Sequence, residues 1–357
     1  MKDTDLPFVG LHAHSTFSLN DGFGYPQEHQ KFAYENGMNA LALTDHGTCA
    51  GLSYAILNAK KMREEGKDFK AILGVEAYFI PDVIEWREIY EEIKKDKKAA
   101  RALKKRESTT TAETDGSSRE SSTTLPRYAH LILFAQNQVG LNNIYSIVSE
   151  SHDENHFYRR PRVDFNLLRK YNEGVICASA CLGGIVGREM YSGRDAGLNE
   201  EEIYQNALAK LKTFVEIYGD RFYGELQWNN VPEQHIVNKM VIRASKEIGI
   251  KIISTADSHY PTQDAWRDRE MYKRLGWLSR GTPSWLTEDD MKMPESVDDI
   301  GYELYPKNGD QMWDSYKKYS EECKFVYDDD LVYDSIVKTH WIANTRVEDF
   351  MPDDTVR

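Results

Sequence analysis

Seven short apolar runs, rich in β-branched residues and bounded by turn residues, recur along the chain. They are PFVGLH, NALALTDH, KAILGVEAYF, AHLILFAQ, GVICASACLGG, FYGELQW and KIISTADSHY. Helical patterns such as SYAILNAKKMREEG and EEIYQNALAKLKTFVEIYG lie between most of them. Continuous apolar strands that alternate with helices are typical of a parallel sheet covered by helices. We therefore predict an α/β fold, and seven such units favour a closed or nearly closed barrel. An open doubly wound sheet is the alternative, although no GxGxxG or GxxxxGKS motif is present.

Two segments depart from this alternation. EWREIYEEIKKDKKAARALKKRE predicts a charged helix, and STTTAETDGSSRESSTTLPR is too polar to order itself. We expect an insertion at about 83–127 that consists of a projecting helix and a mobile loop. The lysines of this charged segment are either solvated or track DNA, and the loop, which enters directly before His130, is placed to gate the site. After the seventh run, QDAWRDREMYKRLGWLSRG begins a mainly helical region. The predicted domains are therefore a barrel over 1–270 and a helical extension over 271–357.

The charge balance limits the possible partners. The formal net charge is −13, so a protein that coats nucleic acid non-specifically is excluded and any nucleic-acid contact should be local. No apolar run is long enough to span a bilayer and MKDTDLPF lacks a signal-peptide core, so we expect a cytoplasmic protein with no membrane partner. The four cysteines show no CxxC pair and are expected to be reduced, with one of them available as a ligand.

Metal-ligand residue types follow or lie on six of the seven runs. They are His12, His14, Asp45, His46, Glu76, His130, Cys181, Asp257 and His259. In barrels the carboxyl ends of the strands surround one mouth, so these side chains should converge there. Residues i and i+2 of a strand face the same side, so His12 with His14, and Asp257 with His259, can each serve a common site.

Three residues near these ends keep open roles. Asp45 and His46 are adjacent and must point apart, so we take His46 as the ligand and Asp45 as an acceptor that orients an imidazole. Glu225 in YGELQ is either such an orienting residue or purely structural. A single buried histidine or cysteine is more often ordinary core, and only the set as a whole favours a metal site.

The ordered motifs HAHSTFSLNDG, LTDHG, GVEAYF, AHLILFAQNQVGLNNIYSIVSESH, FYRRPRVD, ASACLGG and TADSHY carry a family resemblance. Over residues 6–262 the chain resembles the PHP (polymerase and histidinol phosphatase) domain, in the version at the N-terminus of bacterial DNA polymerase III alpha subunits. The resemblance implies a distorted (β/α)7 barrel. YELYPKNGDQMWDSYKKYS and DSIVKTHWIANTRVEDF also resemble the segment that leads from that barrel toward the polymerase palm.

The resemblance further implies up to three divalent ions, with zinc, manganese or iron all suited to the ligands. By this resemblance His12, His14 and Asp257 bind the first ion, and Glu76 bridges it to a second held by His130 and Cys181. Asp21, His46 and His259 take the third. His12, His14, Glu76 and Asp257 are the expected catalytic set. Three such ions against four anionic ligands leave about two positive charges, which favours a phosphate group as the guest.

The segment HFYRRPRVD is the best candidate for a local nucleic-acid contact, because aromatic and arginine side chains can stack on bases and pair with phosphates. The expected contacts are Arg159, Arg160 and Arg162. The alternative is a cluster that is solvated or paired with surface acids, which would leave the chemistry unchanged.

We therefore expect a metal-dependent phosphoesterase that acts on DNA 3′ ends as a 3′-5′ exonuclease of the proofreading type. No palm, fingers or catalytic aspartate cluster follows the barrel, so we do not expect these 357 residues to polymerise DNA alone. A stand-alone relative, one part of a split polymerase and an excised domain all fit this reading. Two other functions stay open: a non-catalytic module that docks with a separate polymerase or replication subunit, its metals only stabilising the fold, and a small-molecule phosphate monoesterase of the histidinol-phosphatase kind.

Overall fold

The computed structural model of the chain describes residues 2–107, 128–279, 287 and 291–351. The strands are β1 (Ala40–Leu43), β2 (Lys70–Phe79), β3 (Ala129–Ala135), β4 (Arg162–Val163), β5 (Val175–Ala178), β6 (Phe222–Leu226) and β7 (Lys251–Ser254). The helices are α1 (Pro26–Glu35), α2 (Leu52–Glu64), α3 (Val83–Glu107), α4 (Gln138–Ser151), α5 (Phe165–Lys170), α6 (Ile185–Asp195), α7 (Glu200–Tyr218), α8 (Pro232–Ile248), α9 (Trp266–Ser279), α11 (Gly309–Glu322) and α12 (Asp329–Trp341). Short 3-10 turns η1 (Gly219–Arg221), η2 (Gln263–Ala265) and η3 (Asp298–Ile300) and the π-helical turn η4 (Ile342–Arg346) complete the described elements. Among the described helices, none has the length and apolar character needed to cross a membrane.

A single sheet in the order β1-β2-β3-β5-β6-β7 forms the centre, and β4 pairs with the last residues of β2. Residues 10–14 join its two edges. The amide of Ala42 in β1 donates to the Gly10 carbonyl at 2.8 Å, and the His14 amide donates to the carbonyl of Ser258, beyond β7, at 2.6 Å. The first apolar run therefore closes the ring through isolated bridges rather than as a regular strand. The predicted seven-membered α/β barrel is confirmed.

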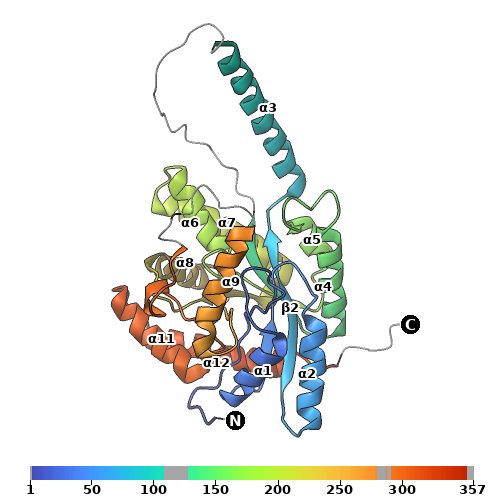
Figure 1. Ribbon diagram of the computed structural model, residues 1–357, viewed down its shortest axis with the longest axis vertical. Helices are drawn as coiled ribbons and strands as arrows, with labels where there is room; N and C mark the ends of the chain where they lie inside the picture. The colour runs from blue at the N-terminus through green and yellow to red at the C-terminus, as the bar shows by residue number, and fades with distance from the viewer. Residues whose placement is uncertain (1, 108–127, 280–286, 288–290, 352–357) are drawn as a thin grey trace, which may run out of the picture.

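Strand β3 runs against its neighbours. It is antiparallel to both β2 and β5, so the expectation of an all-parallel sheet is wrong at this strand. The reason is the connection after β2. Helix α3 projects away from the barrel instead of packing back along its outer face (Figure 1), and β3 begins beside the end of β2, with Ala129 paired with Phe79. The predicted projecting helix is confirmed, whereas the Ser/Thr tract at 108–127 lies outside the described residues.

Each strand contributes to two cores because its alternate residues face opposite sides. In β3, Ile132 and Phe134 point into the barrel, while Leu131 and Leu133 pack against the surrounding helices. Both faces are thus buried, which explains why the runs are continuously apolar in sequence.

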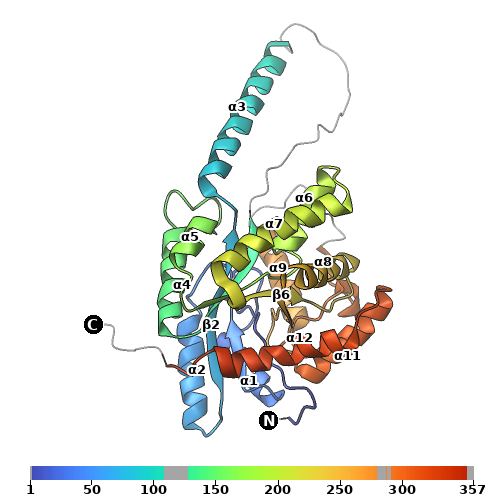
Figure 2. The same cartoon turned by 180° about the vertical axis from the view of Figure 1, so that it is seen from behind.

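The C-terminal region shares these cores. Val332 and Ile336 of α12 belong to the core between barrel and helices, and Ile342 and Val347 of the η4 region pack into the barrel interior. Seen from behind, α12 runs across the lower part of the barrel and η4 follows it (Figure 2). The helical character predicted for this region is confirmed, and the domain boundary near residue 270 stays a prediction.

Candidate metal centre

One end of the barrel collects the candidate ligands. His12 and His14 come from the closing segment, His46 follows β1, Glu76 lies on β2, and Asp257 and His259 follow β7. His130 is the second residue of β3, and it reaches the same end because this strand runs in the opposite direction. The sequence pattern had placed His130 at the end of a strand, so the convergence was right and the strand direction was wrong.

Glu76 lies between two groups of imidazoles. Its Oε2 lies 2.7 Å from His12 Nε2 and 3.2 Å from His14 Nε2. Its Oε1 lies 3.0 Å from His46 Nδ1 and 2.6 Å from His130 Nδ1. The carboxylate is fully buried and presents one oxygen to each group, which is the arrangement that a bridging ligand requires.

The first group is completed by Asp257, whose Oδ1 lies 3.0 Å from His12 Nε2 and 3.4 Å from His14 Nε2. Ligand atoms of His12, His14, Glu76 and Asp257 all lie within 4.8 Å of one another, close enough to share one ion. Asp257 has a φ of 50°, a left-handed conformation that is uncommon outside glycine and clusters at functional sites.

The second group joins His46, Glu76 and His130, again with all ligand atoms within 4.8 Å. Cys181 Sγ lies 3.7 Å from His130 Nδ1, so the cysteine stands beside this group. Burial, followed by the charges of Asp257 and Glu76, holds the pKa of the Cys181 thiol well above its usual range. The thiol is therefore protonated in the metal-free protein, and an ion would have to displace its proton.

The third group lies on the outer side. Asp21 Oδ2 is 3.0 Å from His46 Nε2 and 3.4 Å from His259 Nε2. His14, His46 and His259 also form a group with ligand atoms within 4.8 Å. His46 therefore faces two groups, one with each ring nitrogen. The other oxygen of Asp21 accepts a hydrogen bond from Arg269 Nη2 at 2.5 Å.

The donor set fits divalent cations. Glu76 Oε1, His46 Nδ1 and Asp257 Oδ1 are buried atoms that make no hydrogen bond of acceptable geometry, although each faces the middle of the cluster. Buried polar atoms without partners are costly, and a shared cation satisfies several of them at once. Imidazole, carboxylate and thiolate are also the ligands that zinc and related metals take in proteins.

Glu225 orients His12. Its Oε2 lies 3.0 Å from His12 Nδ1, and the carboxylate also accepts hydrogen bonds from the Ala180 amide at 3.1 Å and the Thr255 hydroxyl at 2.7 Å. A proton held at Nδ1 leaves the Nε2 lone pair directed at Glu76 and Asp257. Of the two roles left open for Glu225, the orienting one is therefore supported by its contacts.

Asp45 acts on an imidazole through a serine. The Ser18 hydroxyl donates to Asp45 Oδ1 at 2.7 Å and lies 3.0 Å from His14 Nδ1. Because the Ser18 hydroxyl donates its own proton to Asp45, its oxygen accepts a hydrogen bond from His14 Nδ1–H. Nε2 of His14 is then unprotonated, and its lone pair is available to a metal ion. Asp45 thus orients His14 rather than its neighbour His46.

The charges of the metal-free cluster are mutually stabilising. Burial would raise the pKa of Glu76 and Asp257, but the surrounding histidines outweigh it and hold both well below the usual range. Burial would likewise lower the pKa of His12 and His46, but the neighbouring carboxylates raise both well above 6.5. In the absence of ions, protons on the imidazoles balance the carboxylates.

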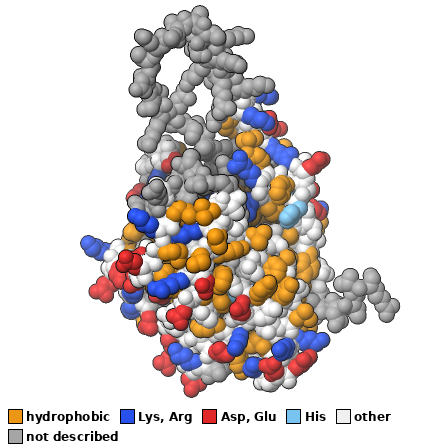
Figure 3. Space-filling view, in the orientation of Figure 1, with side chains coloured by type: hydrophobic (Ala, Val, Ile, Leu, Met, Phe, Trp, Pro, Cys, Tyr) orange, Lys and Arg blue, Asp and Glu red, His pale blue; other side chains and the backbone are white. Residues whose placement is uncertain are grey.

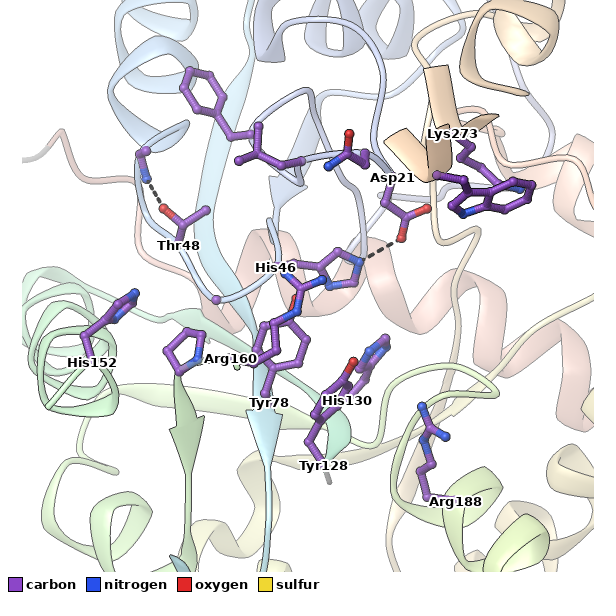
Figure 4. A pocket seen from close by; sticks show the side chains of 17 residues that line it. Asp21, His46, Thr48, Tyr78, Tyr128, His130, His152, Arg160, Arg188 and Lys273 are labelled. Atoms are coloured by element: carbon purple, nitrogen blue, oxygen red, sulfur yellow. Dashed lines mark hydrogen bonds and ion pairs between the residues drawn. The ribbon is translucent and has the colours of Figure 1, made fainter. Parts of the chain in front are cut away.

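A cavity of about 600 Å³ opens beside the cluster, and Asp21, His46 and His130 form part of its wall. Three cationic side chains, Arg160, Arg188 and Lys273, approach it from different sides (Figure 4). Its aromatic lining is Phe17, Tyr78, Tyr128 and Trp277. The cavity combines positive charge with flat rings next to the candidate ligands.

The three arginines of HFYRRPRVD do not act together. Arg160 lines the cavity, whereas the guanidinium of Arg159 lies 5.7 Å from the Tyr158 ring and does not line it. Arg162 is fully buried, with its guanidinium 4.2 Å from the Trp86 ring. Arg162 is therefore not placed to contact nucleic acid, because the short strand β4 turns its side chain into the packing beneath α3.

Sequence reasoning missed Arg188, Lys273 and Trp277. Lys273 and Trp277 lie on α9, which was noted only as a helical pattern, and Arg188 lies on α6, for which no pattern was noted. Only the packing of these helices against the mouth brings the three side chains to the cavity.

Comparison with known proteins agrees with the geometry. A family model described as the PHP domain matches residues 10–229. The DNA polymerase III subunit alpha of Aquifex aeolicus is 35% identical over 255 residues, which are 71% of this chain and 18% of that protein. The corresponding subunit of Borreliella burgdorferi is 32% identical over 258 residues, 72% of this chain and 18% of that protein. The chain thus spans less than a fifth of the length of these relatives.

Among solved structures, an amidohydrolase from Chromobacterium violaceum with bound sulfate and no metal is 14% identical and has a TM-score of 0.37. The alignment covers 74% of this chain and 96% of that one, and a likeness this distant carries no argument about the site. The family match spans more than half of the chain and contains seven of the nine candidate ligands, Asp257 and His259 lying just beyond it. This chain belongs to the PHP domain family.

Proposed function

We propose that the chain is a metal-dependent phosphoesterase that acts on DNA, as a 3′-5′ exonuclease with up to three divalent ions. The observation that carries the proposal is the position of Glu76. Its two oxygens face separate groups of imidazoles, and a cavity with three cationic side chains opens beside them. Adjacent divalent ions beside a cationic cavity suit a phosphate ester better than a neutral substrate.

In this proposal each ion is held by side chains of the barrel mouth. His12, His14 and Asp257 would hold the first ion together with Glu76, and Glu76 would hold the second with His130 and Cys181. Asp21, His46 and His259 are assigned to the third. When bound, such ions activate water as a nucleophile at neutral pH and stabilise negative charge on the phosphate oxygens.

The protein side chains prepare this site. Glu225 keeps a proton on His12 Nδ1, and Ser18 with Asp45 does the same for His14. Arg160, Arg188 and Lys273 surround the cavity and would bind non-bridging phosphate oxygens. The chain supplies no nucleophile of its own in this scheme, since the side chains nearest the ions are all assigned as ligands.

The choice of DNA as substrate, and of a polymerase or replication subunit as partner, is supported by the relatives. The matched proteins are named DNA polymerase III subunit alpha. A free 3′ end is flexible enough to bring its terminal phosphodiester into the cavity, whereas the acidic surface elsewhere disfavours wrapping around a duplex.

The test is digestion of a 5′-labelled single-stranded oligonucleotide in the presence of manganese. We expect a ladder that shortens from the 3′ end. Glu76→Gln keeps the side-chain shape but removes the charge that links two groups, so activity should fall at least about a hundredfold, with fewer bound ions per chain. Glu76→Ala should abolish activity, and metal content is measured by mass spectrometry of the dialysed proteins.

Glu216→Gln, an exposed change on α7, is the matched control and should leave both readouts unchanged. If the wild-type protein leaves the oligonucleotide intact but hydrolyses p-nitrophenyl phosphate, a small-molecule monoesterase replaces the nuclease. If neither substrate is cleaved and chelation only lowers the melting temperature, the metals serve the fold and a docking role replaces catalysis.

A further inference from the structure

Helix α9 supplies one wall of the cavity although it lies outside the segment that the family model matches. Lys273 and Trp277 stand one helical turn apart and both line the cavity. The family match ends at residue 229, so both residues lie beyond the matched segment. Their function has to be argued from their surroundings.

The position of α9 is fixed by contacts with the loop that carries Asp21. Arg269 donates to the backbone carbonyl of Asp21 at 2.9 Å as well as to its carboxylate. The backbone N–H of Asn20 donates to the Tyr272 hydroxyl at 3.1 Å. At Gly276 a Cβ atom would lie 2.5 Å from Asn20 Oδ1, so only glycine allows this close approach. Lys273 and Trp277 are therefore held in place before a substrate arrives.

Lys273 retains positive charge toward the cavity. Its Nζ donates to Glu270 Oε1 at 2.9 Å. The same carboxylate also accepts hydrogen bonds from Arg269 Nη1 at 3.0 Å and from Arg274 Nη1 at 2.7 Å. Three cations thus share Glu270, and Arg269 is further balanced by Asp21. Since an ammonium group has three donors and Glu270 takes one, Lys273 has donors available for a phosphate oxygen.

Trp277 adds a flat apolar surface next to that charge. Its half-buried ring lines the cavity, and Lys273 Nζ lies 5.6 Å from the ring centroid. An aromatic ring beside a cation matches the two parts of a nucleotide, the base and its phosphate. The cavity of about 600 Å³ is also far larger than a phosphate group needs and falls in the range of pockets that enclose whole organic ligands.

We propose that Lys273 and Trp277 form a nucleotide-binding wall, in which Lys273 binds a phosphate oxygen and Trp277 stacks on the adjacent base. The site then takes phosphodiesters that carry a nucleobase in preference to small phosphate esters. This inference rests on the proposed phosphoesterase function and names the part of the substrate that the site selects.

The experiment compares Lys273→Ala and Trp277→Ala with the wild-type protein on two substrates in manganese. One is a fluorescein-labelled single-stranded oligonucleotide, and the other is bis(p-nitrophenyl) phosphate, a diester without a base. We expect kcat/KM on the oligonucleotide to fall about tenfold or more in each variant, and on the small diester to fall by less than about threefold for Trp277→Ala. Trp277→Phe, which keeps a ring, should recover most of the oligonucleotide activity.

Binding supplies a second readout that does not need metal. In the presence of a chelator, fluorescence anisotropy should show a Kd for the oligonucleotide about tenfold higher in both alanine variants. Arg267→Ala and Leu278→Ala are matched controls, because they change a cation and an apolar residue on the exposed face of the same helix. Neither control should alter binding or turnover.

The outcomes separate the two proposals. If the wild-type protein cleaves the oligonucleotide but both alanine variants bind and cleave it normally, the nucleotide-binding wall is wrong and the phosphoesterase stands. Equal losses on both substrates for Trp277→Ala also overturn the wall, since stacking on a base cannot explain them. If nothing is cleaved yet anisotropy depends on Lys273 and Trp277, the phosphoesterase fails and the wall is retained as a nucleotide-binding site.

Discussion

Protons and divalent ions compete for the same imidazoles at the barrel mouth. Burial disfavours charge on His12, His14 and His46, but the neighbouring carboxylates outweigh it and raise the pKa of each above its ordinary value of 6.5. In the metal-free protein these protons stabilise the fold below about pH 6.5, and this contribution is lost as the pH rises through the raised pKa values. A metal ion has to displace the same protons, so its affinity should rise with pH.

The carboxylates act in the opposite direction. Histidines hold the pKa of Asp21, Glu76 and Asp257 well below the usual range despite burial, so their stabilising contribution is present above about pH 4 and lost as the pH falls further. The metal-free protein should therefore be most stable between these two limits, in mildly acidic solution.

This competition gives a prediction for thermal unfolding. With a chelator present, the melting temperature should decrease from about pH 6 to about pH 8.5, and added manganese should raise it by at least about 3 °C more at the higher pH. Calorimetric titration in buffers of different ionisation enthalpy should show proton release on binding. His152→Ala, which changes a cavity residue outside the ligand groups, should behave like the wild type. A metal-induced shift that is equal at both pH values would contradict the competition.

At the scale of elements, the π-helical turn η4 closes the end of the barrel opposite the candidate metal centre. Ile342 and Ala343 are fully buried within the barrel core. Lys70, at the start of β2, donates to the carbonyls of Ala343 at 2.7 Å and Val347 at 3.0 Å. These contacts satisfy backbone acceptors at the end of the turn. Residues 342–347, which we call the plug, are therefore held by both packing and hydrogen bonds.

Truncation of the plug should destabilise the barrel. Ile342→Ala removes buried methyl groups and leaves a cavity, so the free energy of unfolding should fall by about 2–5 kcal/mol. Thr345→Ala, on the exposed side of the same turn, should change it by less than about 0.5 kcal/mol. Urea denaturation followed by circular dichroism measures both. Similar losses for the two variants would show that η4 is not part of the barrel core.

At the scale of the whole molecule, the positive side chains around the cavity beside the candidate metal centre contrast with the net charge of −13 of the chain. Acidic and basic side chains are interspersed on the face seen in Figure 3, around a largely hydrophobic middle, and no extended basic surface is visible there. The cations that face the cavity are Arg160, Arg188 and Lys273. Nucleic acid should therefore be held by a few phosphate contacts only.

The salt dependence of oligonucleotide binding tests this view. Three phosphate contacts on a single strand predict a slope of log K against log salt of about −2, measured by anisotropy in chelator. Lys273→Ala should reduce the magnitude of the slope by about 0.7, and Arg267→Ala should not change it. A wild-type slope steeper than about −4 would indicate a basic surface that the described residues do not provide.

Local patterns were sufficient for the elements and for the chemistry of their ends. All seven predicted runs line the barrel, because burial on both faces leaves a continuous apolar signature in each strand. The nine candidate ligands lie together at its mouth, because closing a barrel brings the strand ends to one place. These features depend on residues that are near one another in sequence and on the geometry of a closed sheet.

Tertiary structure alone decided the rest. The direction of β3 follows from its start beside the end of β2, after the projecting α3, and no pattern within β3 records it. Arg162 became core while Arg160 reached the cavity, because Arg162 lies in β4 and packs on the Trp86 ring, whereas Arg160 precedes the strand and its side chain is not bound by the strand's alternation. Lys273 and Trp277 reached the same cavity because α9 packs on the Asp21 loop, far away in sequence. Sequence determines which face of an element is buried, whereas packing between distant elements determines which side chains share a site.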